Sequence, residues 1–323
     1  MTKNITKKLF LVFFVTLFLL YIGSSLREIK IDAVDYQLSS AWLGNDLDIA
    51  PQESIIYDSN YRYFNEIIES VALVNTDKIY VIESAYDLYM LSVLSMGLDK
   101  LTYLSLNYAL GNDIDYYEIV QQNINQRFHP IGFIEPFTGS FDGQGFEITN
   151  LYFDSIMSDE DYQTMYSGLR YVSMFSKISS TARIHNLGLI NPIIIQPIEW
   201  GIMNYVSALV GENNGLVENV YLIDNRGDVS GFNAEGSFHL SGLVSVNYGT
   251  FKNSFISSEH IKSISVGENE STSAVLYQNF GTVSHLYYDS SIYTDVNGLT
   301  TYSQGLTKSG FQKYASEHGI IVI

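Results

Sequence analysis

Acidic side chains are the residues of this chain best suited to chemistry, and three of them stand in two short stretches. Asp113 and Asp115 occur in Asn-Asp-Ile-Asp, and Asp142 occurs in Phe-Asp-Gly-Gln-Gly. Paired carboxylates act as acid and base in glycosidases, and clustered carboxylates bind Ca²⁺. Both stretches are also typical of tight turns. We therefore predict turn or surface roles for the three aspartates, with calcium binding and catalysis as the alternatives.

Other common catalytic arrangements are missing from the sequence. A zinc metallopeptidase needs two histidines at i and i+4, which does not occur among His129, His185, His239, His260, His285 and His318. No Gly-x-Ser-x-Gly segment offers a serine nucleophile, and no glycine loop followed by lysine offers a phosphate site. The chain also has no cysteine, which excludes disulfides and thiolate metal sites. These observations predict a protein without enzymatic activity, metal or cofactor.

The charge balance bears on possible partners. The chain has 17 Lys and Arg against 35 Asp and Glu, a net charge of −18. Such a surface repels phosphate backbones, so we do not expect nucleic-acid binding.

The segment 1–26 has the pattern of an export signal. Lys3, Lys7 and Lys8 precede an unbroken apolar run, Leu9–Ile22, and small residues follow it. A basic flank, an apolar stretch and small residues together are typical of a signal peptide, and the uncharged run that continues to Leu26 is just long enough for a membrane helix. We predict a cleaved signal peptide or a retained signal-anchor helix over 1–26. The rest of the chain is then secreted or anchored at the cell surface.

The remainder is predicted to form three further parts. Residues 27–76 are mixed and acidic, and we interpret them as a stalk and lead-in. Residues 77–306 are rich in strand-like runs separated by Gly, Asn and Asp turns, apart from one helix near 84–96 that begins at a capping box, Ser84-Ala-Tyr-Asp87. Residues 307–323 are expected to close the C-terminal end as a short cap.

A repeated pattern organises the strand-rich part. Five segments begin with an apolar residue and carry Asn or His at their third position: Asn150, Asn186, Asn219, Asn253 and His285. The sequence numbers of successive members differ by 36, 33, 34 and 32. Self-similarity at a nearly fixed period is the signature of a solenoid, and Asn side chains at such a corner can stack as a ladder. We predict one row of Asn150, Asn186, Asn219 and Asn253.

A second register has nearly the same period. Ser173, Ser207, Ser241 and Ser273 begin short apolar segments at intervals of 34, 34 and 32, and the last three segments end in Asn-x-Gly. Two strand runs per unit fit one coil of a parallel β-helix, in which equivalent residues stack about 4.8 Å apart. We therefore predict an all-β, parallel β-helical solenoid, and a β-sandwich is the alternative.

The same alignment predicts an outward aromatic row. Alternation should restart after the corner Asn, so that Tyr152, Gly188, Tyr221, Phe255 and Tyr287 point away from the core. Exposed aromatic rows often mark contact sites. The predicted binding residues are Tyr152, Tyr221, Phe255 and Tyr287, unless the rings stack on one another, lie under a loop or turn into the core.

Several of these stretches resemble the GLUG-motif repeats of bacterial surface proteins. The similar residues are GSFDGQGFEITNLYF, IHNLGL, SALVGENNGLVENVY and SGLVSVNYGTFKNSF. The resemblance implies a right-handed parallel β-helix on exported proteins, often adhesins, and the repeat also occurs as an accessory region of immunoglobulin-A-cleaving metallopeptidases. We predict a non-enzymatic adhesion or binding module whose partner is a protein or glycan of a host or cell envelope. A structural spacer of the envelope and a carbohydrate-active enzyme are the alternatives.

Overall fold

The computed structural model describes residues 60–68, 71–122, 128–154, 171–195, 204–224, 238–258, 271–292, 302–307, 310 and 313. The chain divides into two compact units, Met1–Asp46 and Leu47–Ile323, and every described residue belongs to the second. The predicted export segment and nearly all of the predicted C-terminal cap lie outside the described residues. Within the described part of the chain, no helix is long and apolar enough to cross a membrane.

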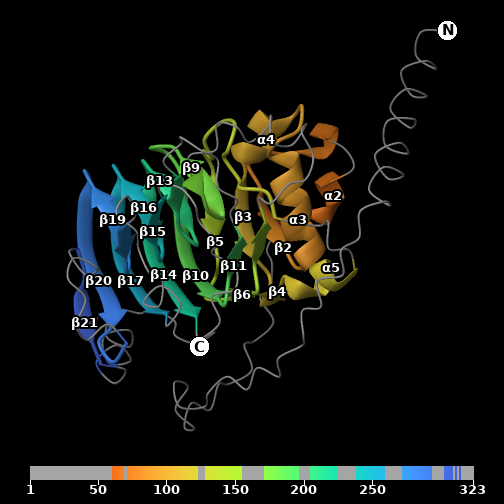
Figure 1. The fold of residues 1–323 in the computed structure, drawn as a ribbon. Helices are drawn as coiled ribbons and strands as arrows, with labels where there is room; N and C mark the ends of the chain where they lie inside the picture. Colours follow the sequence, from red (N-terminus) through yellow and green to blue (C-terminus); the bar gives the residue numbers. More distant parts are fainter. Residues whose placement is uncertain are drawn as a thin grey trace, which may run out of the picture. The chain divides into compact units, whose positions relative to one another are not determined.

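One large parallel sheet runs through the described unit (Figure 1). Its strands pair in the order β1-β2-β3-β5-β10-β14-β17-β20-β21, β6 also pairs with β10, and β4 pairs with β6. Their bounds are β1 Tyr61–Tyr63, β2 Ile79–Ile82, β3 Asn107–Leu110, β4 Ile114–Asp115, β5 Ser140–Asp142, β6 Glu147–Thr149, β10 Arg183–Ile190, β14 Leu216–Asp224, β17 Thr250–Ser258, β20 Thr282–Asp289 and β21 Gln304–Leu306. The first strand, β1, lies in the region that was predicted to be only a stalk and lead-in.

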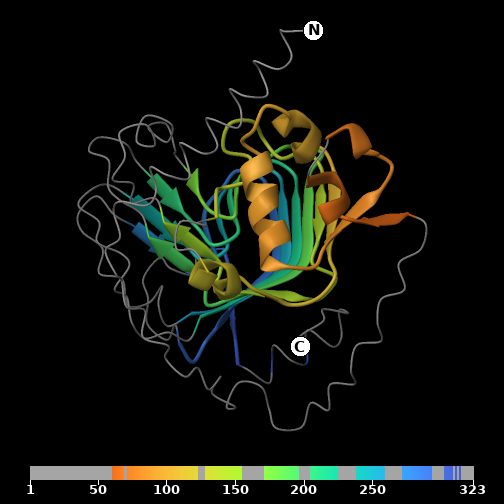
Figure 2. The same ribbon diagram turned by 90° about the vertical axis from the view of Figure 1, so that its right-hand side faces the viewer.

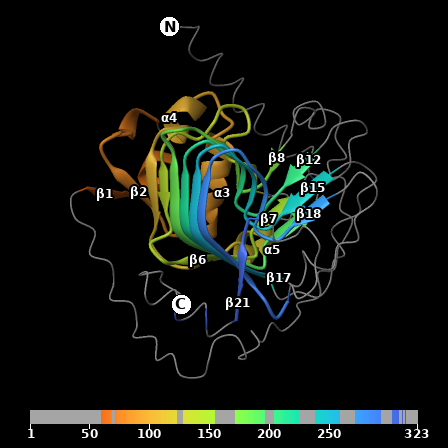
Figure 3. The same cartoon turned by 90° about the vertical axis from the view of Figure 1, so that its left-hand side faces the viewer.

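Three smaller parallel sheets complete the strand framework. Their members are β7 Tyr152–Asp154 and β11 Ile193–Ile195; β8 Tyr171–Val172, β12 Asn204–Val206, β15 Phe238–Ser241 and β18 Ser271–Ser273; and β9 Phe175–Ile178, β13 Val210–Asn213, β16 Val244–Asn247 and β19 Leu276–Asn279. Figure 3 shows β8, β12, β15 and β18 as neighbours beside the large sheet. The described part of the chain is therefore mostly strand in parallel sheets, as an all-β prediction requires.

The strand registers confirm the period in the later units. Ile184 pairs with Val217, Val217 with Phe251, and Phe251 with Val283, so each strand lies beside its equivalent one unit later. The side chains of this row point inward, and Tyr108, Phe141, Ile184, Val217 and Phe251 are all buried. β-branched and aromatic residues suit such a position because they pack well on a pleated surface.

The first unit departs from the predicted alignment, and Asn150 does not belong to the row of Asn186. Phe141 pairs with Ile184, whereas Ile148 pairs with Leu189. The reason is a longer connection: residues 143–146 separate β5 from β6 where only 186–187 stand in β10. Gln144 and Gly145 both have positive φ there, which lets the connection turn tightly. Placing Asn150 in one row with the other three was therefore wrong.

The recurring Asn marks a backbone conformation. Asn186, Asn219, Asn253 and His285 have φ between 52° and 55°, in the left-handed region that Asn tolerates better than most residues. Each one interrupts the alternation of its strand, as in a β-bulge. In β14, for example, Val217 and Val220 both face the core although two residues separate them.

A helix lies across the N-terminal end of the stacked strands (Figure 2). This is α3, Ala85–Leu94, and the Oγ of Ser84 accepts a hydrogen bond from the Asp87 N–H at 3.1 Å, as the capping box predicts. Leu88 and Leu91 are buried in the main core. The short helical segments at this end are α2 Asn65–Ile68, η2 Val71–Leu73, α4 Lys100–Leu104 and α5 Tyr117–Gln122.

A buried amide ladder connects the last three units. Asn213 Nδ2 donates to Asn247 Oδ1, and Asn247 Nδ2 donates to Asn279 Oδ1, both at 2.7 Å. These residues open the three Asn-x-Gly turns. Asn213 and Asn247 are fully buried. A buried amide has to be hydrogen-bonded to be tolerated, so the ladder keeps the turns stacked directly above one another.

We predict that Asn247→Ala lowers the free energy of unfolding by about 2 to 3 kcal/mol, because it removes a hydrogen-bond partner of the buried Asn213 amide and of the half-buried Asn279 amide. Urea unfolding of the purified chain measures the change. The control is Asn214→Ala in a neighbouring turn, where the half-buried amide bonds Glu212 Oε1 and Ile178 O, and it should cost less than about 1 kcal/mol. Equal effects of the two substitutions would show that the ladder contributes no more to the free energy of unfolding than the hydrogen bonds of Asn214 do.

Candidate functional site

The predicted outward aromatic row exists in part, but its rings are buried. Gly188, Tyr221, Phe255 and Tyr287 pair in successive strands. However, Tyr221, Phe255 and Tyr287 keep only 3%, 1% and 7% of their surface exposed. Tyr152 lies elsewhere, in β7, where it is buried in the main core. The prediction that Tyr152, Tyr221, Phe255 and Tyr287 form an exposed binding face was therefore wrong.

A close contact around Gly188 explains part of this burial. The Tyr221 ring packs over Gly188, and a Cβ added at Gly188 would overlap the ring at its Cζ. The Tyr221 hydroxyl reaches two strands away and donates to Glu147 Oε1 at 2.5 Å. Burial raises the pKa of Glu147 above 4.5, the Tyr221 hydrogen bond opposes this shift, and Asp113 adds to it. Sequence periodicity predicts which way a ring points, but it cannot show what the ring reaches.

The carboxylates of Asp113 and Asp115 both accept hydrogen bonds. Asp113 Oδ1 accepts the Glu147 N–H at 2.8 Å. Asp115 Oδ1 accepts the Tyr117 N–H at 3.0 Å and Asn150 Nδ2 at 2.9 Å. Among the described residues, no group of three or more His, Cys, Asp or Glu side chains could hold a metal ion. Asp115 therefore makes one hydrogen bond within its own turn, whereas the other bonds of the two carboxylates join them to the next unit.

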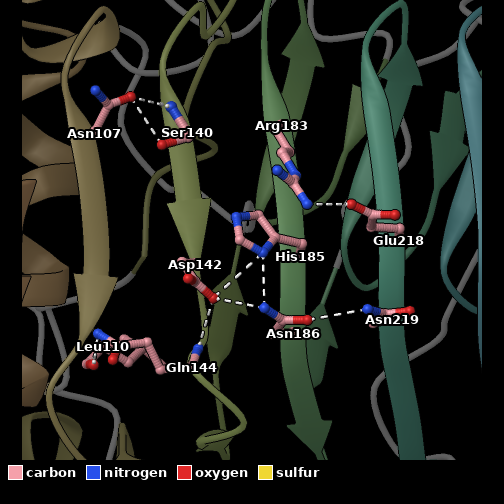
Figure 4. Close-up of polar contacts among 10 residues, drawn as sticks. All are labelled: Asn107, Leu110, Ser140, Asp142, Gln144, Arg183, His185, Asn186, Glu218 and Asn219. Carbon is pink, nitrogen blue, oxygen red and sulfur yellow. Dashed lines mark hydrogen bonds and ion pairs between the residues drawn. The ribbon is translucent and has the colours of Figure 1, made fainter. Parts of the chain in front are cut away.

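Asp142 lies at one end of a series of side-chain hydrogen bonds on the outer face of the large sheet (Figure 4). Its Oδ1 accepts the Gln144 N–H at 2.9 Å and Asn186 Nδ2 at 3.0 Å, and lies 3.4 Å from His185 Nδ1. Asn186 Oδ1 in turn accepts Asn219 Nδ2 at 3.1 Å. The Oδ1 of Asn219 is buried without a hydrogen-bond partner in the described part of the structure. In the corner Asn row, the side-chain amides of Asn186 and Asn219 are therefore hydrogen-bonded to each other, and the row ends at the carboxylate of Asp142.

A network of ion pairs lies on the same face of the sheet. Glu218 contacts the Arg183 guanidinium on one side (Figure 4), and on the other side its Oε2 lies 2.9 Å from Lys252 Nζ. Burial alone raises the pKa of Glu218, but the hydrogen bonds and charges of Lys252 and Arg183 outweigh it, so the pKa falls below 4.5. Burial lowers the pKa of His185 below 6.5, although Asp142 opposes it. These opposite charges satisfy one another, so the network serves as cross-strand support.

A second aromatic column is also largely covered. The rings of Tyr171, Tyr205 and His239 stand in one row of paired strands and are all buried. The half-buried Tyr277 stacks on His239 with ring centroids 4.3 Å apart and an interplanar angle of 16°. Burial lowers the pKa of His239. These rings contribute packing between two of the smaller sheets.

One aromatic pair is exposed. Tyr248 and Phe280 are the middle residues of two successive Asn-x-Gly turns, and 52% and 64% of their surfaces are exposed. Their ring centroids lie 5.1 Å apart with an interplanar angle of 14°, so the rings stack face to face. Asn214 holds the equivalent position one unit earlier. We name Tyr248 and Phe280 the turn pair. Sequence reasoning missed the turn pair because it read the middle position of Asn-x-Gly as variable.

The backbone beneath the turn pair is closely fixed. The N–H of Tyr248 donates to Asn213 O, and the N–H of Phe280 donates to Asn247 O, both at 2.7 Å. A Cβ at Gly249 would overlap the carbonyl oxygen of Gly215, so only glycine lets the turns approach this closely. The turn pair therefore projects from a rigid base at the end of the amide ladder.

Comparison with known proteins gives one partial similarity. The chain is similar to halomucin of Haloquadratum walsbyi, with 29% identity over 171 residues. The match covers 51% of this chain and 2% of halomucin, so this chain spans only a small part of that protein's length. No family model matches the chain, and no solved structure matches it. The resemblance to GLUG repeats therefore stays a prediction.

We predict a specific coupling between Gly188 and Tyr221. Gly188→Ala should lower the free energy of unfolding by about 1 to 3 kcal/mol, because the new methyl group displaces the Tyr221 ring. In a Tyr221→Ala background the same substitution should cost less than about 1 kcal/mol. Urea unfolding of the four proteins in the cycle measures both values. Equal costs in the two backgrounds would contradict the packing that we describe.

The pKa shifts predict opposite pH effects for two carboxylates. Glu218 has a lowered pKa, so its stabilising contribution is present above pH 4.5 and is lost as the pH falls through the pKa of the folded state. Glu147 has a raised pKa, so its contribution is present below pH 4.5 and is lost as the pH rises through the raised value. On acidification, Glu218→Gln should lose less stability than the parent and Glu147→Gln should lose more. Thermal melts between pH 7 and about pH 3 test this, because Glu218 loses its contribution only below pH 4.5, and parallel curves for all three proteins would refute it.

Proposed function

We propose that this chain is a non-enzymatic binding module located outside the cell, built as a parallel β-helix. Equivalent strands stack one unit after another, and the resemblance to GLUG repeats implies that the solenoid is right-handed. The predicted export segment, 1–26, supports a location at the cell surface, either anchored or secreted. The partial similarity to halomucin agrees with that location. The partner is a protein or glycan of a host or cell envelope.

The turn pair is the observation that carries this proposal. Two exposed aromatic rings that stack on each other form a continuous apolar patch, and exposed apolar patches often mark a contact site. The rings are also held in place before any partner arrives, because the amide ladder and the tight glycine turns fix their backbone. Such preorganisation lowers the entropic cost of binding. The turn pair thus combines exposure, shape and rigidity.

Other surfaces of the described residues offer less. The ions of the outer sheet face neutralise one another, and the two long aromatic columns are mostly buried. The carboxylates that would suggest catalysis accept hydrogen bonds from nearby backbone or amide groups. Binding through exposed rings therefore explains the surface better than catalysis does.

We predict that a Tyr248→Ser, Phe280→Ser double variant loses most of its attachment to cells or isolated envelope, with a reduction of at least about tenfold. A binding assay with labelled purified protein measures the attachment. The control is Tyr86→Ser, which removes an aromatic side chain of similar exposure, 51%, on α3 at the N-terminal end. Both proteins should unfold at nearly the parent temperature, because neither substitution touches the core. Attachment at the parent level by the folded double variant would overturn the proposal.

A further inference from the structure

We infer that the turn pair binds an uncharged sugar ring, stacked on the outer face of Phe280. This inference rests on the proposed function and names the ligand class of the same site. It follows from the direction in which the rings face and from the side chains around them.

The stacking leaves one ring face open. Tyr248 covers one face of Phe280, since the two rings are nearly parallel. The other face of Phe280 points away from β16, toward the end of the sheet. β19 is the last strand of that sheet and pairs only with β16 among the described residues. A further ring placed there would extend the column by one unit, at the spacing that separates neighbouring strands.

The opposite end of the column is less suitable. Asn214 occupies the position before Tyr248, and its amide already donates to Glu212 Oε1 at 2.9 Å and to Ile178 O at 3.3 Å. A ligand at that end would meet a polar group that is already satisfied and a carboxylate beside it. The open face of Phe280, which is also the more exposed ring, is therefore the better platform.

The neighbouring side chains are polar and uncharged. Gln278 and Thr282 stand two positions before and after Phe280, and neither side chain has a hydrogen-bond partner in the part of the chain that is described. An amide and a hydroxyl supply both donors and acceptors, which suits the hydroxyl groups of a sugar. No charged side chain occurs between Ala274 and Ser284. This segment therefore supplies no cation for an acidic sugar, and the net charge of −18 would repel it.

An aromatic face selects for the face of a sugar ring from which C–H bonds project. The face of the ring is electron-rich, so it attracts groups with a partial positive charge such as the C–H bonds on one side of a pyranose. A cation would be attracted to the same face, but a compact cation leaves the flanking amide and hydroxyl without partners. The combination of a stacked face with unpaired hydrogen-bonding groups favours a neutral sugar.

The test uses the purified full chain and saturation-transfer nuclear magnetic resonance. The neutral probes are the methyl glycosides of glucose, galactose and N-acetylglucosamine, and the charged probes are glucuronate and choline. We expect at least one neutral glycoside to bind with a dissociation constant on the order of millimolar, with the strongest transfer to its ring C–H protons. Phe280→Leu should weaken this binding at least about tenfold, whereas Phe280→Trp should keep or strengthen it.

The leucine variant separates stacking from general apolar contact, because it keeps the apolar character and most of the volume but removes the flat face. Binding of sugar by Phe280→Leu at the parent level would overturn the inference, and so would binding of choline or glucuronate alone, or of no probe at all. The last result combined with loss of attachment in the double serine variant would leave the proposed function standing with a protein partner. Sugar binding without any effect of the double variant on attachment would instead refute the proposed function and keep the ligand class.

Discussion

The buried amide ladder of Asn213, Asn247 and Asn279 is the interaction on which the rest of this surface depends. The amides of Asn213 and Asn247 are fully buried and cannot be solvated, so they have to find hydrogen-bond partners in neighbouring units, and Asn279 is half-buried at the end of the ladder. This requirement keeps the three turns stacked directly above one another. Because the turns are aligned, the strands that follow them pair in register, and the rings at the middle of the last two turns stack.

The two Asn rows donate in opposite directions along the stack. In the corner row, Asn219 donates to Asn186, which donates to Asp142, so the hydrogen bonds run toward the N-terminal end and finish on a carboxylate. In the buried ladder they run toward the C-terminal end and finish on Asn279, which bonds its own Gly281. An anionic acceptor closes one row and a local turn closes the other. The last hydrogen bond of each row is thus made without a further Asn: by the Asp142 carboxylate in the corner row and by the Gly281 backbone in the ladder.

The sequence predicts the framework well and the surface poorly, for physical reasons. The inward row Ile184, Val217, Phe251 follows directly from the repeated apolar position. The first unit was misaligned because the longer connection at 143–146 shifts its second half, and a left-handed Asn150 imitates the corner Asn. Periodicity indicates that Tyr221 points away from the core, but burial depends on Gly188 and Glu147 in other strands. The turn pair escapes detection because its first equivalent is Asn214.

The stacked turns also have a consequence for how such a chain can change by gene duplication. Each of the last three units contributes one Asn to the ladder, one glycine to the turn and one variable position between them. Copying one of these units within the gene would lengthen the stack by a repeat of the same contacts, and it would add one side chain to the column that Tyr248 and Phe280 now form. The number of stacked rings can therefore change with the number of units while the fold is preserved, and for the ligand that we propose more rings would mean greater avidity.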